Sequence, residues 1–101
     1  MVGGEGLRVP PSAGENGAIV AVQDNSVQRA IPAGIETGSF ALRAWDNNET
    51  IYIGYDETVD DATGFPMEDG EVISVDLNAA VQGVFFFAEQ AGDGIRYITT
   101  E

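Results

Sequence analysis

The sequence predicts an all-β protein: a small antiparallel β-sandwich, jelly-roll-like in type, preceded by an extended N-terminal arm. Three observations support this class. Short runs of Val, Ile, Thr and aromatic residues recur about every 8 to 12 residues, with Gly-rich or Asp- and Asn-rich turns between them. No stretch of ten or more residues has a helical period. A length of 101 residues with 44% hydrophobic content suits a single domain with a real core.

The arm is assigned to residues 1–16 and the sandwich to residues 17–101. Four glycines and the pair Pro10–Pro11 prevent any periodic pattern in the arm. Leu7 and Val9 alternate around Arg8 and could make a short edge contact; a frayed terminus is the alternative. The start of the chain has no signal-peptide pattern, and no apolar run approaches the ~20 residues of a membrane span. We therefore expect a soluble protein made in a cytoplasm.

The first half of the domain contains four predicted strands, at residues 18–22, 27–31, 39–45 and 50–54. The third strand alternates, so that Phe40, Leu42 and Ala44 face one side. The turn at 46–49 joins it to the fourth strand, and a hairpin is predicted there.

The second half begins with a long acidic loop at residues 55–70. An alternating strand follows at 71–77, with Ile73, Val75 and Leu77 on its apolar face. Residues 78–83 are expected to form a connector with one short helical turn. Two further strands are predicted at 84–88 and 95–99, with a Gly-containing turn between them.

The run at 84–88 predicts a subunit interface. Val84, Phe86 and Ala88 face one way and Phe85 and Phe87 the other, so both faces of the strand look buried. One face would be the core and the other would meet a second subunit; a central strand covered by a loop is the alternative. Residues 43 and 96 are Arg on strands, and their planar side chains suit either an interface or carboxylates of the same chain. The predicted interface set is Val84, Phe85, Phe87, Arg43 and Arg96.

The charge excludes several classes of function. The chain has 17 Asp and Glu against four Arg, a net charge of -13, and no Lys, His or Cys. Nucleic-acid binding is disfavoured because the phosphate backbone would be repelled. Disulfides, thiol and imidazole catalysis and Schiff-base chemistry are excluded by composition. The excess of Asp and Glu with no Lys favours a protein of a halophilic organism. In molar salt the Debye length falls to ~3 Å, which screens the repulsion among the acidic side chains. An ordinary acidic protein is the alternative.

The acidic loop is the one place where the sequence suggests a cation site. Asp56, Asp60 and Asp61 are weak candidates, because hard cations prefer several oxygen ligands but the spacing does not match a calcium loop. A solvated acidic face is the preferred interpretation. No cofactor is expected and the chain is not expected to be an enzyme, since its serines have no His or Lys to activate them.

Four aromatic residues lie near predicted turns and could face a ligand such as a sugar: Trp45, Tyr52, Tyr55 and Phe65. The simpler interpretation makes Trp45 and Tyr52 a cross-strand pair within the predicted hairpin.

Residues 26–99 also contain six short motifs in a fixed order. They are ALRA at 41–44, DNN at 46–48, IYIG at 51–54, GFPMEDGE at 64–71, ISVDL at 73–77 and IRY at 95–97. Their order and spacing resemble small β-sandwich proteins encoded in the structural modules of tailed phages and tailed archaeal viruses. The first 25 residues do not match, so the resemblance implies nothing about the arm.

The resemblance implies a virion component displayed on the particle: a capsid decoration, turret or head-fibre subunit, with a tail attachment protein as a weaker possibility. Such a subunit would form a homo-oligomer, a trimer or pentamer, and bind the major capsid protein or other virion proteins, with no nucleic-acid or membrane partner. Together with the charge, this predicts a structural protein of the virion surface of a halophilic archaeal virus, assembled in the host cytoplasm. A receptor- or glycan-binding module of a virus tail or fibre is the alternative.

Overall fold

The computed structural model describes residues 15–35, 38–77 and 83–100, and these residues form eight β-strands and no helix. The strands are β1 (Asn16–Val20), β2 (Ser26–Arg29), β3 (Ser39–Ala44), β4 (Ile51–Gly54), β5 (Phe65–Met67), β6 (Val72–Asp76), β7 (Phe85–Ala88) and β8 (Gly94–Thr99). Within the described part of the chain there is accordingly no helix that could cross a membrane.

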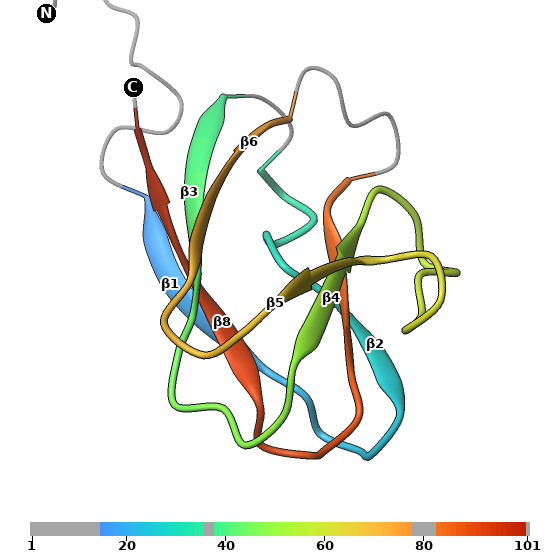
Figure 1. Cartoon of the computed structure of the whole chain (residues 1–101). Coiled ribbons are helices and arrows are strands. Elements are labelled where there is room, and N and C mark those ends of the chain that lie inside the picture. The colour runs from blue at the N-terminus through green and yellow to red at the C-terminus, as the bar shows by residue number, and fades with distance from the viewer. Residues whose placement is uncertain (1–14, 36–37, 78–82, 101) are drawn as a thin grey trace, which may run out of the picture.

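Two four-stranded antiparallel sheets pack face to face (Figure 1). One sheet has the order β1-β8-β3-β6 and the other β2-β7-β4-β5. The first strand pairs with the last, the second with the seventh, the third with the sixth and the fourth with the fifth. This is the strand order of a jelly roll, in which one long hairpin folds over on itself. The predicted all-β sandwich is therefore confirmed.

The core lies between the sheets and is filled by alternate residues of the strands. Phe40, Leu42 and Ala44 of β3 are fully buried, as the alternation predicts. Phe86 of β7 faces them from the other sheet as part of the same apolar cluster. The ring of Phe40 meets that of Tyr97 edge to face, with centroids 6.1 Å apart, a favourable aromatic geometry.

The predicted hairpin between residues 39–45 and 50–54 is wrong. β3 pairs with β6 and β8, whereas β4 pairs with β5 and β7, so the turn carries the chain from one sheet to the other. The reason is long-range. Asp93, fully buried in the turn before β8, accepts hydrogen bonds from the backbone N–H groups of Asn48 and Glu49, each at 2.9 Å. Asp46 starts the crossover in a left-handed conformation, with φ of 60°.

The long acidic loop was also predicted incompletely, because it contains β5. Phe65–Met67 pairs with β4 at the edge of its sheet. An edge position tolerates Pro66, which has no N–H to donate. Met67 is fully buried, so the strand anchors the loop to the core.

The boundaries of the predicted arm and connector fall largely outside the described residues. Residues 1–14 and 78–82 are not described, so the arm and the helical turn stay predictions. At the junction, β1 begins at Asn16, and the carbonyl of Glu15 accepts hydrogen bonds from the backbone N–H and hydroxyl of Thr99. Sheet hydrogen bonding therefore reaches two residues earlier than the predicted start of the domain at 17.

Candidate interaction site

The most distinctive surface feature is a cluster of two arginines and a tryptophan on the outer face of the β1-β8-β3-β6 sheet. Arg43 of β3 and Arg96 of β8 are register partners, so both side chains leave the same face. Their Cζ atoms lie 4.7 Å and 5.0 Å from the centroid of the Trp45 ring, which follows β3 directly. Like charges opposite each other on adjacent strands are unfavourable. The shared aromatic ring offsets this through two cation–π contacts.

Apolar side chains surround this cluster. Val20, Val72 and Ile98 come from three different strands of the sheet, and each is 53–58% exposed. A shallow hollow of about 250 Å³ is lined by Arg43 and Arg96 together with Val72 and Ile98. A second, of about 160 Å³, is lined by Val20 and Trp45. The arginine–tryptophan face is defined here by six residues: Val20, Arg43, Trp45, Val72, Arg96 and Ile98.

The charge of this face differs from that of the rest of the molecule. The whole chain has a net charge of -13, yet two of its four arginines occupy the centre of one face. Asp46 lies beside Trp45, and Asp76 lies at a corner of the sheet opposite Ser39. The centre of the face is therefore positive and apolar, a combination suited to binding another protein surface.

The sequence contained a signal for this face that the interface prediction used only in part. Arg43 and Arg96 were predicted, but Val72 and Ile98 were not. Alternation along β6 turns Val72 to the face of the sheet opposite the one on which Val75 is buried. In the same way, Ile98 of β8 lies on the face opposite the buried Tyr97. Exposed apolar residues on two strands of one sheet are the pattern that could have completed the set.

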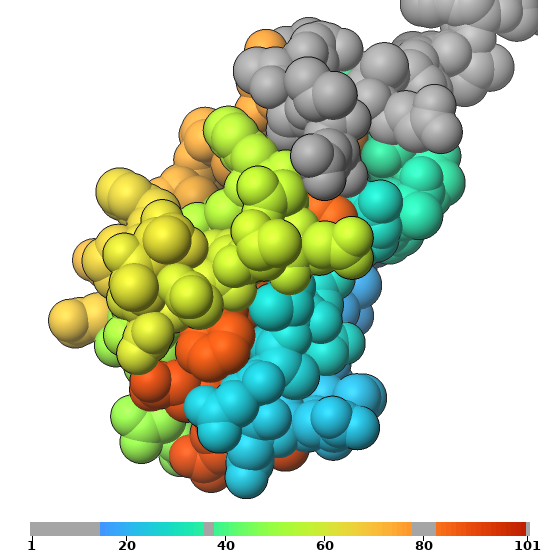
Figure 2. Space-filling view, turned by 90° about the vertical axis from the view of Figure 1, so that its right-hand side faces the viewer, coloured from blue at the N-terminus to red at the C-terminus, as the bar shows by residue number. Residues whose placement is uncertain are grey.

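The opposite sheet presents a different outer face, shown in Figure 2 with β7 in orange between β2 in cyan and the segment after β4 in green and yellow. Tyr52 of β4 and Phe87 of β7 are register partners, with ring centroids 6.2 Å apart. Burial raises the pKa of the Tyr52 phenol, and the negative charges of Glu89, Asp61 and Glu49 raise it further. We call this the tyrosine face and define it by Glu49, Tyr52, Asp61, Phe87 and Glu89.

The residues predicted on 84–88 lie in three different surroundings. Val84 is fully buried in the core, so it is not part of any surface. Phe85 is also buried within the chain, with the Arg29 guanidinium 4.9 Å from its ring centroid. Phe87 is half-buried beside Tyr52. The acidic loop packs beside the second face of β7, with the buried Val59 against Gly54, the register partner of Phe85. Phe87 is the member of the three that reaches the surface.

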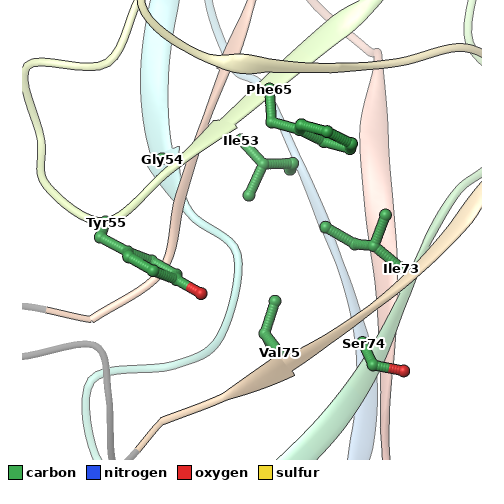
Figure 3. A pocket seen from close by; sticks show the side chains of 7 residues that line it. All are labelled: Ile53, Gly54, Tyr55, Phe65, Ile73, Ser74 and Val75. Carbon is green, nitrogen blue, oxygen red and sulfur yellow. The ribbon is translucent and has the colours of Figure 1, made fainter.

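An apolar cleft opens on the side of the sandwich where the edge strands β5 and β6 lie (Figure 3). Its volume is about 460 Å³. Ile53 and Ile73 approach it from the two sheets, and the exposed rings of Tyr55 and Phe65 border it. This size falls within the range of small-molecule sites. The cleft brings together two of the four predicted ligand-facing aromatic residues.

The other two predicted aromatics lie elsewhere. Because β3 and β4 belong to opposite sheets, Trp45 and Tyr52 are not the cross-strand pair that the hairpin prediction required. Trp45 contacts the arginines of one outer face, and Tyr52 contacts Phe87 on the other. The four aromatics therefore do not form one binding platform.

Two carboxylates of the acidic loop, those of Asp56 and Asp60, accept hydrogen bonds that form local turns. Asp56 Oδ1 accepts hydrogen bonds from the N–H and hydroxyl of Thr58. Asp60 Oδ1 accepts three, from the N–H of Ala62 and from the N–H and hydroxyl of Thr63, at 2.9–3.0 Å. These bonds lower the pKa of both carboxyls below the ordinary value of 3.8. Asp61 is exposed, and the described residues contain no group of three or more His, Cys, Asp or Glu placed to hold a metal.

Asp93 is the residue of structural importance that the sequence did not reveal. Its carboxylate joins the turn before β8 to the crossover, and Asn47 reinforces the link by exchanging two hydrogen bonds with Gly94, at 2.7 Å and 3.0 Å. This network holds the segment that carries Trp45. The position of the arginine–tryptophan cluster thus depends on a buried carboxylate more than 40 residues away in sequence, as the separations of 44 and 45 residues show.

Comparison with protein-family models, with curated proteins and with solved structures finds no match for this chain.

Proposed function

We propose that this protein is a structural subunit of a virion surface, a decoration or turret protein of a tailed virus with a halophilic archaeal host, which acts by assembly and not by catalysis. The observation that carries the proposal is the arginine–tryptophan face. This face combines two arginines held against Trp45 with three exposed apolar side chains. The chain as a whole is strongly acidic, with a net charge of -13.

Assembly through this face is energetically reasonable. Val20, Val72 and Ile98 are each more than half exposed, and full burial of such a side chain contributes about 1.5–3 kcal/mol. Trp45 and the two arginines are residue types that concentrate binding energy at protein interfaces. The cation–π contacts limit the motion of both guanidinium groups before binding, which reduces the entropy lost on association.

The charge supports a salt-rich setting for the same assembly. Copies that each carry a charge of -13 repel one another in dilute buffer. Molar salt screens that repulsion, whereas the burial of apolar area is unaffected or strengthened. Acidic subunits can associate through an apolar interface with a neutral or positive centre, because such a contact does not bring their carboxylates together.

The fold is compatible with this role by analogy only. Jelly rolls occur in viral capsid proteins and also in lectins and other unrelated proteins, so the fold does not decide the function. The motif order described above favours the virion role. The major capsid protein or another virion protein is the expected partner besides a second copy of the chain.

The proposal is tested by measuring the mass of the protein in molar KCl by light scattering, together with cosedimentation on shells of the major capsid protein. Ile98→Asp should abolish both self-association and shell binding. Val22→Asp is the matched control, because Val22 is an exposed apolar residue (74%) that lies after β1 and outside the face. A wild-type chain that stays monomeric and does not bind shells, or an Ile98→Asp variant that behaves as wild type, would contradict the proposal.

A second candidate function rests on the cleft beside β5 and β6. The exposed rings of Tyr55 and Phe65 border an apolar hollow of about 460 Å³, which could take one face of a sugar or another small ligand. We propose glycan binding as the alternative. Binding to a glycan array that Phe65→Ala abolishes and Trp45→Ala leaves unchanged would favour it, and no binding at any glycan would remove it.

A further inference from the structure

We infer that the protein associates head to tail: the arginine–tryptophan face of one copy binds the tyrosine face of the next. This inference rests on the proposed assembly function and specifies its partner surface. Three observations carry it: the opposite chemistry of the two outer faces, their placement on opposite sides of one sandwich, and the cost of pairing either face with itself.

The two faces are complementary in charge and in the types of side chain that they present. The first presents Arg43 and Arg96 around Trp45. The second presents the Tyr52–Phe87 ring pair with acids around it. Aromatic rings and guanidinium planes stack well on one another, and guanidinium groups bind carboxylates with two parallel hydrogen bonds.

The position of the acids follows from the backbone. Ile51 pairs with Ala88, so Glu89, which follows β7 directly, and Glu49, two residues before β4, lie at the same end of these two strands. The loop that contains Asp61 packs against Tyr52, because a Cβ on Gly64 would lie only 2.5 Å from the Tyr52 Cβ. Glu49, Asp61 and Glu89 are the carboxylates whose negative charge acts on the Tyr52 side of the ring pair. Arg29 lies further along β2, two positions from Val27, where it contacts Phe85.

Self-pairing of either face is electrostatically unfavourable. Two arginine–tryptophan faces in contact would place four guanidinium groups in the centre of one interface. Two tyrosine faces would bring six carboxylates together. Like charges that are buried against each other at an interface are screened little by salt, and their repulsion excludes wrong pairings. The mixed pairing sets positive against negative groups and leaves the apolar residues of both faces to supply the buried area.

Head-to-tail contact has a direct consequence for the size of the assembly. A face that binds itself closes after two copies, whereas two different complementary faces leave one of each free at the ends. Association then continues until a ring closes or a stack forms.

Charge-swapped variants test the inference in molar KCl by analytical ultracentrifugation. Arg43→Glu with Arg96→Glu reverses the first face, and Glu49→Arg with Glu89→Arg reverses the second. Each variant alone should associate at least about tenfold more weakly than the wild type. Mixing the two variants, or combining all four substitutions in one chain, should restore association. Glu57→Arg with Glu68→Arg is the matched control, since both are exposed loop residues outside the strands of either face.

The outcomes separate the two proposals. If the first variant is monomeric but the Glu49→Arg/Glu89→Arg variant associates like the wild type, the assembly function stands and the head-to-tail pairing is overturned. If both variants associate normally, neither face is used. If the wild type is monomeric at all concentrations, the pairing is overturned too, and shell binding decides whether the assembly function survives. Far-ultraviolet circular dichroism of each variant verifies that the sandwich is folded.

Discussion

Replacing Asp93 with Ala should destabilise the protein far more than its place in a turn suggests. The carboxylate is fully buried, and its two oxygens each accept one backbone N–H, from Asn48 and Glu49, at 2.9 Å. Ala removes both acceptors and leaves two part-buried donors without them. It also frees the crossover between β3 and β4, which carries Trp45.

The magnitude follows from those two bonds. A hydrogen bond to a charged group contributes about 1.5–3 kcal/mol, and a part-buried donor that can still reach water loses less than a fully buried one. We therefore expect Asp93→Ala to lower the free energy of unfolding by about 2–4 kcal/mol. For a domain of this size, each kcal/mol corresponds to about 4–8 °C in Tm. Asp93→Asn should not recover this stability, because the amide keeps one acceptor oxygen but sets its NH2 group against the second backbone N–H.

Denaturant unfolding in molar KCl, followed by circular dichroism, measures the change as a shift in midpoint at constant slope. Asp69→Ala is the matched control: Asp69 also accepts a backbone N–H from the crossover, that of Asn47 at 3.1 Å, but it is exposed. Its loss should cost no more than about 0.5 kcal/mol. If Asp93→Ala and Asp69→Ala cost the same, burial of the carboxylate is not what makes it important, and the reasoning fails.

Three further predictions concern backbone packing, pH and salt. Gly94→Ala should unfold at lower denaturant than the wild type, since its Cβ would collide with the carbonyl oxygen of Ile19 on the paired strand; an unchanged midpoint would contradict this. Carboxyl ¹³C titration should find the pKa values of Asp56 and Asp60 below 3.8, with Thr58→Val raising only the first. Because these values are lowered by folding, their contribution to stability is present above the unfolded-state pKa and is lost as pH falls through the folded-state pKa. The free energy of unfolding should rise from dilute to molar KCl as the charge of -13 is screened, and equal stability at both would refute the halophilic interpretation.

Local pattern in the sequence was enough for the fold class and for most of the core. Alternation alone predicts that Phe40, Leu42 and Ala44 lie inside, because the period of a strand sends every second side chain to the same side. The run at 84–88 is buried on its core side, whereas on its second face Phe85 is buried and Phe87 is half-buried, so the predicted subunit contact there stays a prediction. Arg29 lies over the Phe85 ring and Tyr52 lies beside Phe87, and periodicity cannot show these contacts.

What the tertiary structure alone decided was which strands are neighbours. A turn at 46–49 looks the same whether it closes a hairpin or crosses between sheets, and the choice here depends on a buried carboxylate at position 93. The same long-range pairing brings Arg43 of β3 beside Arg96 of β8 and sends Trp45 and Tyr52 to opposite faces. Composition and periodicity therefore determined a strongly acidic β-sandwich without thiol, imidazole or amine chemistry. Which side chains share an outer face of this sandwich was decided by contacts between residues far apart in the chain, because strand order is a property of the whole fold.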